Sequence, residues 1–280
     1  MSGPQPKPFE CPEPVFWYLV GLIATDGCLL EKNWLVNITS KDRSLLVQIQ
    51  QAVHSRGWIS TTRGSSGNPA YRWELKSKVL WNKLVQVGLT PRKTLTIGAL
   101  AVPDSMFKEF FRGVIDGDGN IRCWNHPTNG RTQWAVRIVG CSKPFFQWMQ
   151  ETIHRLWRVE GVLHEEAPKP ATRHTKYTLK YGKIAAKVIL AECYYAGALA
   201  LDRKRVLAEQ CATSVVGWSK SKTVGDPERW RSWKYGHVFL HPPARALPKS
   251  NDIDPAAGLV AERIPLWRAG VAKLGETHWA

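Results

Sequence analysis

Residues 16–27 read FWYLVGLIATDG, and residues 107–119 read FKEFFRGVIDGDG. Each segment is an apolar run with a glycine in its interior, and each ends in Asp-Gly with the acid five positions after that glycine. The matching glycine and acid pairs are Gly21 with Asp26 and Gly113 with Asp118. The two segments therefore form an internal repeat, and the two acids are its equivalent members.

Apolar runs of this length are typical of helices, so the repeat predicts two helices that each end in an acid. The helix dipole disfavours an acid there, and a glycine inside a helix costs about 1 kcal/mol relative to alanine. Close packing of the two helix backbones through Gly21 and Gly113 accounts for the interior glycines. The terminal glycines, Gly27 and Gly119, are expected at turn positions with positive φ.

Packing of the two helices side by side would bring Asp26 and Asp118 together. Adjacent carboxylates repel each other unless a cation lies between them, and a hard divalent ion with oxygen ligands is the natural candidate. Such an ion can generate the nucleophile and stabilise the leaving oxygen in phosphodiester hydrolysis. A buried helix with an acidic C-cap would explain either segment alone, but two such segments in one chain favour a shared site.

The segments LVGLIATDG at residues 19–27 and FRGVIDGDG at residues 111–119 resemble the signature of the LAGLIDADG homing endonucleases. Two copies in one chain resemble the single-chain, monomeric branch of that family. The resemblance implies a catalytic metal site for Mg²⁺, with Mn²⁺ also supporting activity. The metal ligands that it implies are Asp26 and Asp118, together with the backbone carbonyls of Thr25 and Gly117.

The first motif departs from the family pattern at one position. It has Ala24 where the family usually has an acid, whereas the second motif keeps Asp116. In the resembling family this acid mostly supports the helix interface. The departure therefore changes a structural detail and leaves the nuclease interpretation in place.

A basic cluster follows the predicted closing helix of each half, TPRKT at residues 90–94 and LDRKR at residues 201–205. A lysine from this region lies near the scissile phosphate in the resembling family, and Lys93 and Lys204 match it by order and spacing. A cation at that place stabilises the charge of a phosphorane-like transition state. Complementing the carbonyls at a helix C-terminus is the alternative role for each lysine.

The charge of the chain indicates a polyanionic partner. Its net charge is +16 and its isoelectric point is about 9.8, with no evident membrane segment. Double-stranded DNA is the first choice of partner and a membrane is not expected, although a high charge can also serve solubility. With 280 residues, 44% of them apolar, the chain can bury a full core in one or two domains.

Cysteine usage and the N-terminal sequence indicate an intracellular protein. The six cysteines are scattered without a CxxC pair, which favours reduced thiols over a zinc ribbon or a disulfide framework. The first residues show no secretory signal. We therefore expect the cytoplasm or nucleoid if the source is bacterial, with an organelle as the other option.

Strand and helix patterns alternate twice in the same order along the chain. Strands are predicted at residues 28–40, 58–63, 70–76, 120–124, 131–141, 162–166 and 176–181, and the intervening helices at residues 41–56, 78–87, 143–157 and 184–196. Each half is then αββαββα, a saddle-shaped antiparallel sheet backed by helices. The expected fold is α+β, with two pseudo-symmetric halves joined at the two motif helices.

The expected halves are residues 1–100 and 101–209, connected by a linker at residues 90–105. Residues 210–280 form an extension rich in Trp, Pro and Arg. Aromatic residues interleaved with cations can form a base-stacking arm, and a packing extension that covers a sheet edge is equally compatible with this composition.

Polar side chains recur at every second position of the predicted strands in both halves, which sets a polar face against an apolar one. Arg, Lys, Gln, Asn and Glu read base edges in the major groove, which admits a two-stranded β-ribbon. A solvated antiparallel sheet alternates in the same way. The expected DNA contacts are Asn37, Thr39, Arg63, Arg72, Glu74, Lys76, Arg122, Arg131, Gln133, Arg137, Lys176, Thr178 and Lys180.

Taken together with the charge and the strand pattern, the resemblance implies a monomeric, intron-encoded homing endonuclease. It would cleave double-stranded DNA by metal-dependent phosphodiester hydrolysis at a long site, and the site would be asymmetric because the halves differ in sequence. Two alternatives use the same fold. One is an RNA-splicing maturase that binds intron RNA, and the other is a DNA-binding regulator that does not cleave.

Overall fold

The computed structural model describes residues 9–54, 57–64, 67–168 and 174–214. The predicted C-terminal extension lies outside the described residues from position 215 onwards. Within the described part of the chain, every helix is too short or too polar to cross a bilayer.

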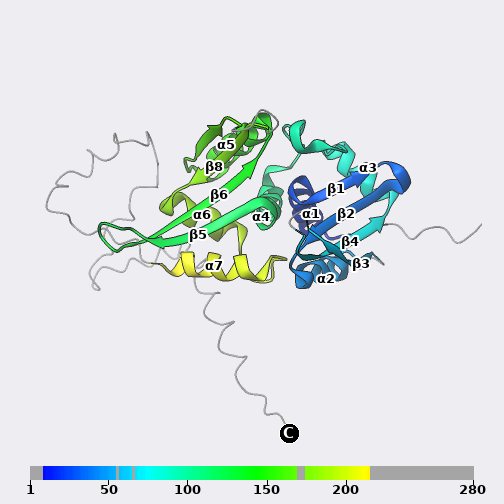
Figure 1. The fold of residues 1–280 in the computed structure, drawn as a ribbon, viewed down its shortest axis with the longest axis horizontal. Coiled ribbons are helices and arrows are strands. Elements are labelled where there is room, and N and C mark those ends of the chain that lie inside the picture. Colours follow the sequence, from blue (N-terminus) through cyan, green and yellow to red (C-terminus); the bar gives the residue numbers. More distant parts are fainter. Residues whose placement is uncertain (1–8, 55–56, 65–66, 169–173, 215–280) are drawn as a thin grey trace, which may run out of the picture. The chain divides into compact units, whose positions relative to one another are not determined.

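The described elements run twice through the same order, which confirms the αββαββα prediction for each half and the α+β class (Figure 1). The first run is α1 (Glu13–Thr25), β1 (Gly27–Leu30), β2 (Leu35–Ser40), α2 (Arg43–Ala52), β3 (Trp58–Arg63), β4 (Pro69–Lys76) and α3 (Lys78–Val87). The second is α4 (Phe107–Asp118), β5 (Gly119–Asn125), β6 (Thr132–Gly140), α5 (Lys143–Trp157), β7 (Val162–Glu166), β8 (Lys176–Tyr181) and α6 (Lys183–Cys193). A further helix, α7 (Asp202–Thr213), follows the second run.

Each run contains one antiparallel sheet of four strands with the same topology. The strand orders are β1-β2-β4-β3 and β5-β6-β8-β7, so the second and fourth strands of each run are central. The registers also correspond, because Gly27 pairs with Ile38 in the first sheet and Gly119 pairs with Ile138 in the second. Helices cover one face of each sheet, where Ile38 and Ile138 are buried.

Some boundaries differ from the predicted ones for local reasons. The stretch predicted as extended over residues 28–40 divides at a 3₁₀ turn, Lys32–Trp34, in which Asn33 has a left-handed backbone with φ 66°. Helix α2 ends before His54, which has φ 45°. The predicted linker over residues 90–105 contains two short 3₁₀ turns, Lys93–Leu95 and Asp104–Met106. Left-handed residues interrupt regular hydrogen bonding, and apolar periodicity does not detect them.

Helices α1 and α4 pack against each other with their backbones in close approach (Figure 1). A Cβ atom built on Gly21 would lie 1.9 Å from the carbonyl oxygen of Phe110, and one built on Gly113 would lie 2.2 Å from the carbonyl oxygen of Tyr18. Any side chain at either position would therefore force the helices apart. This pairing places the C-terminal ends of the two helices, and the acids they carry, side by side.

Candidate active site at the paired helix ends

Asp26 and Asp118 occupy equivalent positions at the ends of α1 and α4. Asp26 caps α1, its backbone N–H donating to the Leu22 carbonyl at 2.9 Å, and Asp118 is the last residue of α4. Both residues are open to solvent. Partial burial of its carboxyl group, and then the nearby charge of Asp118, raise the pKa of Asp26 to about 6. The two acids therefore lie within electrostatic reach of each other.

The glycines that follow these acids do not have the positive φ that the sequence predicted, so that prediction is wrong. Gly119 has φ −75° and ψ 149°, and the described glycines with positive φ do not include Gly27. A Cβ atom on either glycine would lie 2.6 Å from a Cα atom of its own helix, that of Ile23 or Ile115. Glycine is needed here because each strand begins immediately against the last turn of the helix.

Thr25 and Gly117 face each other across the helix pair, beside the acids. The Thr25 hydroxyl donates within its own helix, at 3.0 Å from the Leu22 carbonyl and 3.2 Å from the Gly21 carbonyl. A Cβ atom on Gly117 would lie 1.9 Å from the Thr25 hydroxyl oxygen. The Gly117 carbonyl accepts from Lys204 at 3.3 Å. The predicted metal-binding carbonyls thus belong to two residues that are in close contact across the helix pair.

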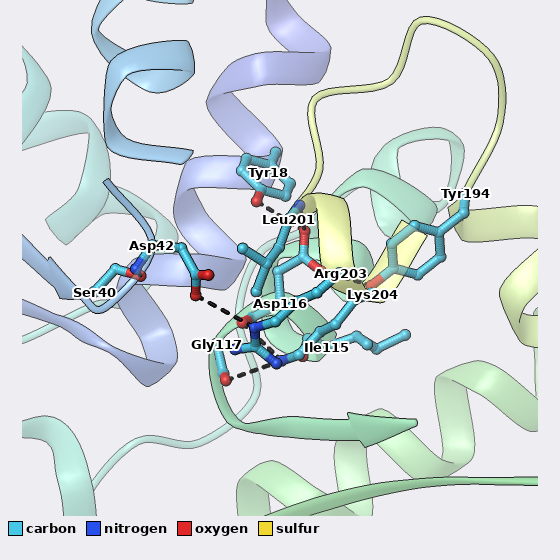
Figure 2. Close-up of polar contacts among 10 residues, drawn as sticks. All are labelled: Tyr18, Ser40, Asp42, Ile115, Asp116, Gly117, Tyr194, Leu201, Arg203 and Lys204. Atoms are coloured by element: carbon cyan, nitrogen blue, oxygen red, sulfur yellow. Dashed lines mark hydrogen bonds and ion pairs between the residues drawn. The ribbon is translucent and has the colours of Figure 1, made fainter. Parts of the chain in front are cut away.

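Lys93 and Lys204 are brought to the same helix ends, and both are almost fully buried. The Lys93 ammonium donates to the Gly27 carbonyl. The Lys204 ammonium donates to the carbonyls of Ile115 at 2.5 Å and Asp116 at 2.8 Å as well as to that of Gly117 (Figure 2). Lys204 therefore makes the contacts of the alternative prediction, which placed it at the carbonyls of a helix C-terminus.

The two acids and the two lysines shift one another's pKa values. Burial lowers the pKa of Lys204 to about 8 and also lowers the pKa of Lys93, while the charges of Asp26 and Asp118 oppose that fall. Burial likewise raises the pKa of Asp118, and the two lysines oppose the rise. Two acids and two cations thus form one coupled cluster.

The donor set fits a hard divalent cation that keeps part of its water shell. The described residues contain no group of three or more His, Cys, Asp or Glu side chains able to hold a metal. Asp26 and Asp118 would therefore supply two carboxylates, with water or a substrate phosphate completing the shell, which is the arrangement Mg²⁺ prefers. The raised pKa of each acid marks a place where added positive charge stabilises the ionised form.

Strand register gathers most of the predicted DNA-contacting residues on one face of each sheet. In the first sheet Asn37 pairs with Glu74 and Thr39 pairs with Arg72, and Lys76 lies on the same face. In the second sheet the corresponding face carries Arg122, Gln133, Arg137, Lys176, Thr178 and Lys180. Arg131 directly precedes β6 and has the same parity as Gln133.

Arg63 is not brought to that face. It pairs with Pro69, so it shares a face with Ile59 and Thr61, while Arg72 pairs with Ser60 on the opposite side. Arg63 is exposed at the end of its strand. Successive residues of a strand point to opposite faces of the sheet, so Arg63 lies on the face opposite to the other predicted contacts.

The polar faces also carry aromatic residues that are absent from the predicted DNA contacts. Trp58 is 70% exposed and pairs with Glu74, which places it on the face of Asn37. On the second sheet Trp124 pairs with Gln133, and the Arg122 guanidinium lies 5.4 Å from its ring centre. Trp58 lies on a different strand from Arg72 and Glu74. Which face of the sheet it shares with them therefore depends on how the two strands pair, and the sequence does not give that pairing.

The second half carries a buried acid, Asp116, for which the resemblance implied only a supporting role at the helix interface. Asp116 is buried and accepts hydrogen bonds from Tyr18, Tyr194 and the backbone of Leu201. The presence of an acid in one motif and Ala24 in the other was the available signal. Its partners lie too far away in the chain to be found from spacing.

Two four-stranded antiparallel sheets, each preceded by a helix of one close-packed pair with an acid at its end, define the class of this protein. Residues 13–88 match the family model of the LAGLIDADG-like domain. Among solved structures, the homing endonuclease I-WcaI bound to its DNA recognition sequence is similar with a TM-score of 0.51 and 11% identity, over 74% of this chain and 94% of that chain. The fold is thus similar to that of I-WcaI, and a LAGLIDADG-like domain is recognised over residues 13–88 of the chain.

Two further similar structures have lower scores. Full-length DUF199/WhiA from Thermatoga maritima has a TM-score of 0.47 and 12% identity, over 77% of this chain and 66% of that chain. I-DmoI in complex with DNA and Mn has a TM-score of 0.39 and 17% identity, over 60% of this chain and 88% of that chain. No curated protein matches the chain.

Proposed function

We propose that this protein is a monomeric homing endonuclease that cleaves double-stranded DNA at a long, asymmetric site. The observation that carries the proposal is the convergence of Asp26, Asp118, Lys93 and Lys204 at the ends of α1 and α4. A protein that only binds DNA has no need for two acids beside the phosphates, where they would repel the backbone. A nuclease needs them to hold a metal.

Asp26 and Asp118 are the proposed ligands of Mg²⁺, with the carbonyls of Thr25 and Gly117 beside them, and Mn²⁺ is expected to substitute. The bound ion supplies activation of water and neutralisation of charge on the leaving oxygen. Both side chains are open to solvent, which lets a phosphate approach them. The raised pKa of Asp26, about 6, keeps a fraction of its carboxyl groups protonated near pH 6, so metal and protons compete for its oxygens. Burial raises the pKa of Asp118 in the same direction.

Lys93 and Lys204 are the proposed sources of positive potential at the scissile phosphates. An ammonium group has three N–H donors, and those of Lys204 are directed to three carbonyls of α4. Lys204 therefore acts as a fixed charge and not as a mobile donor. Such a charge needs no reorganisation when negative charge develops in the transition state.

The polar faces of the two sheets are the proposed DNA-reading surfaces. The first presents Asn37 and Arg72 with the acid Glu74, whereas the second presents Arg122 and Arg137. Different donors and acceptors on the two faces would read different half-sites, which makes the target asymmetric. The net charge of +16 supports binding to the phosphate backbone and predicts that affinity falls as salt increases.

The proposal is tested by a cleavage selection on a randomised double-stranded DNA library with purified protein and Mg²⁺, followed by sequencing of the recovered ends. A parallel selection in Ca²⁺ recovers bound DNA. Discrete cuts at one long motif are expected. Specific binding without cuts in Mg²⁺ would instead support a DNA-binding regulator, and preference for intron RNA over DNA would support a maturase.

The acids are tested on the recovered site. Asp26→Asn and Asp118→Asn should keep DNA affinity and abolish cutting, because they remove metal ligands without adding positive charge. Asp104→Asn is the matched control, since Asp104 is an exposed acid paired with Arg155 outside the cluster. Equal loss of binding and cutting in the two site variants would contradict the assigned roles. Light scattering on the complex gives its stoichiometry, for which one chain per site is expected.

A further inference from the structure

The two motif helices differ in buried polar residues, although their packing is alike. Each of three polar residues of α4 stands at the same distance from Gly113 as an apolar residue of α1 stands from Gly21. The pairs are Glu109 with Trp17, Arg112 with Val20 and Asp116 with Ala24. All three polar residues are buried. Because helix α1 packs without such groups, they are not required by the pairing itself.

Asp116 connects three parts of the chain through its carboxylate (Figure 2). One oxygen accepts from the Tyr18 hydroxyl at 2.9 Å and from the backbone N–H of Leu201 at 2.8 Å, and the other accepts from the Tyr194 hydroxyl at 2.6 Å. Tyr18 belongs to α1, Tyr194 follows α6, and Leu201 precedes α7. Asp116 thus ties the segment between α6 and α7 to the helix pair.

Leu201 in turn fixes the first turn of α7. It is the N-cap residue of that helix, and its carbonyl accepts from the backbone N–H groups of Lys204 at 2.9 Å and Arg205 at 3.0 Å. The side chain of Lys204 then returns to the main chain of α4, including the carbonyl of Asp116 itself. The contacts form a closed circuit from Asp116 through Leu201 and Lys204 back to Asp116.

The turn that carries Lys204 has a second attachment, which is weaker. Arg203 Nε lies 3.3 Å from a carboxylate oxygen of Asp42, in the first half of the chain (Figure 2). The Arg203 side chain is 60% exposed. Exposed ion pairs contribute little to holding a segment in place, whereas buried hydrogen bonds to a carboxylate contribute substantially. The circuit through Asp116 is therefore the stronger of these two restraints.

Lys93 is held in place by a different set of hydrogen bonds. Its 3₁₀ turn is closed by backbone hydrogen bonds from Thr96 at 3.0 Å and Ile97 at 2.8 Å to the Lys93 carbonyl. The Ile97 carbonyl accepts from the buried hydroxyl of Ser142, in the second half of the chain. With Ala24 in place of an acid, α1 has no carboxylate at the position of Asp116. The two lysines thus occupy equivalent positions, but different contacts hold them there.

We propose that Asp116 is a positioning residue for Lys204, so that its loss impairs one of the two half-sites and spares the other. The positioning itself follows from the circuit of hydrogen bonds. Its consequence for strand cleavage rests on the proposed nuclease function. Chemical labelling of the lysines separates the two, because it needs neither DNA nor metal.

The first readout is the rate at which Lys204 and Lys93 are acylated by an amine-reactive ester, followed by peptide mass spectrometry of the full-length protein. Asp116→Ala should raise the acylation rate at Lys204 by about tenfold. Loss of buried hydrogen bonds to a charged group is expected to increase by that factor the fraction of molecules in which this segment is locally open. The rate at Lys93 should stay unchanged. Asp116→Asn should remain near the wild-type rate, since an amide can keep all three contacts with the Tyr194 hydroxyl as acceptor.

Two adjacent tyrosines give a matched pair of milder variants. Tyr194→Phe removes one contact of Asp116, whereas Tyr195→Phe removes a hydroxyl that donates to Glu109. Tyr194→Phe should raise acylation of Lys204 severalfold, and Tyr195→Phe should not. Equal effects of the two variants, a parallel rise at Lys93, or an unchanged rate at Lys204 in Asp116→Ala would each overturn the proposal.

The second readout is strand-specific cleavage of a DNA target labelled at either end. Asp116→Ala should slow the cutting of one strand by about tenfold or more, so that a singly nicked product accumulates. Equal slowing of both strands would overturn the assignment to one half-site. Absence of cutting by the wild-type protein would contradict the proposed function and leave the acylation experiment to decide the role of Asp116.

Discussion

Substitution of Gly21 by alanine tests the close approach of α1 and α4, because two physical effects predict opposite signs. Alanine is favoured over glycine inside a helix by about 1 kcal/mol, so on propensity alone Gly21→Ala would stabilise the protein. The new Cβ atom would, however, lie 1.9 Å from the Phe110 carbonyl oxygen and 2.9 Å from the Val114 nitrogen. Both of these atoms belong to the backbone of α4 and cannot rotate away.

The magnitude follows from the size of the overlap. Ordinary van der Waals contact begins at 3.4 Å, so the helices would have to separate by about 1.5 Å at this point. Overpacking a core typically costs about 1 to 3 kcal/mol where side chains can adjust, and a backbone-to-backbone clash lies at or beyond the upper limit. After the gain in propensity is subtracted, we expect Gly21→Ala to lower the free energy of unfolding by at least about 2 kcal/mol.

The assay is equilibrium unfolding in urea, with Gly98→Ala as the control. A Cβ atom on Gly98 would meet nothing within 4 Å, and its φ is not in the left-handed region. Gly98→Ala should therefore be neutral, or stabilising by up to about 1 kcal/mol through the unfolded state. A Gly21→Ala protein as stable as the wild type would refute the helix-pair geometry, and with it the juxtaposition of Asp26 and Asp118.

Three further predictions concern charge, burial and the DNA face. The pKa of Asp26 in the folded protein, about 6, exceeds its ordinary value of 3.8; between these values the folded state retains a proton that the unfolded chain has lost, so stability should fall as pH rises through this window. Asp26→Asn should flatten that fall in urea titrations at several pH values, and a wild-type slope would contradict the assigned shift. Glu109→Gln should cost about 3 to 5 kcal/mol in urea unfolding because it leaves the buried guanidinium of Arg112 without its counter-charge, whereas Glu165→Gln in an exposed pair should cost less than about 1 kcal/mol. Trp58→Ala should weaken DNA binding about tenfold in fluorescence anisotropy, with unfolding unchanged, since the side chain is 70% exposed; an unchanged Kd would remove it from the DNA face.

The order of elements could be predicted because local signals agree with the fold throughout each half. Helix α5 (Lys143–Trp157) and strand β8 (Lys176–Tyr181) have the predicted bounds, since the period of their apolar residues matches the face that is buried. Helix α7 was not predicted. It begins inside the basic cluster LDRKR and has few apolar residues in a helical pattern, so periodicity gives no signal for it.

The acids could be predicted because a repeat within one chain supplies its own comparison. Asp26 and Asp118 stand at the same offset from a glycine, and the structure brings both to the ends of the paired helices. The reason for the terminal glycines could not be predicted in the same way. Close approach to the preceding helix turn and a left-handed turn both require glycine, and only the backbone dihedral angles distinguish them.

The different contacts that hold Lys93 and Lys204 could not be predicted from the sequence either, for another reason. The partners of Asp116 are separated from it by 98, 78 and 85 positions, so no local period or spacing connects them. A symmetric dimer would have to use one device at both half-sites. Two halves within one chain are free of that requirement, because Ala24 and Asp116 can differ. The helix glycines and the terminal acids have the same role in both halves. The contacts that hold Lys93 and Lys204 differ between the halves. We therefore expect variants of the shared residues to affect both strands of a DNA target, and variants of Asp116 to affect one.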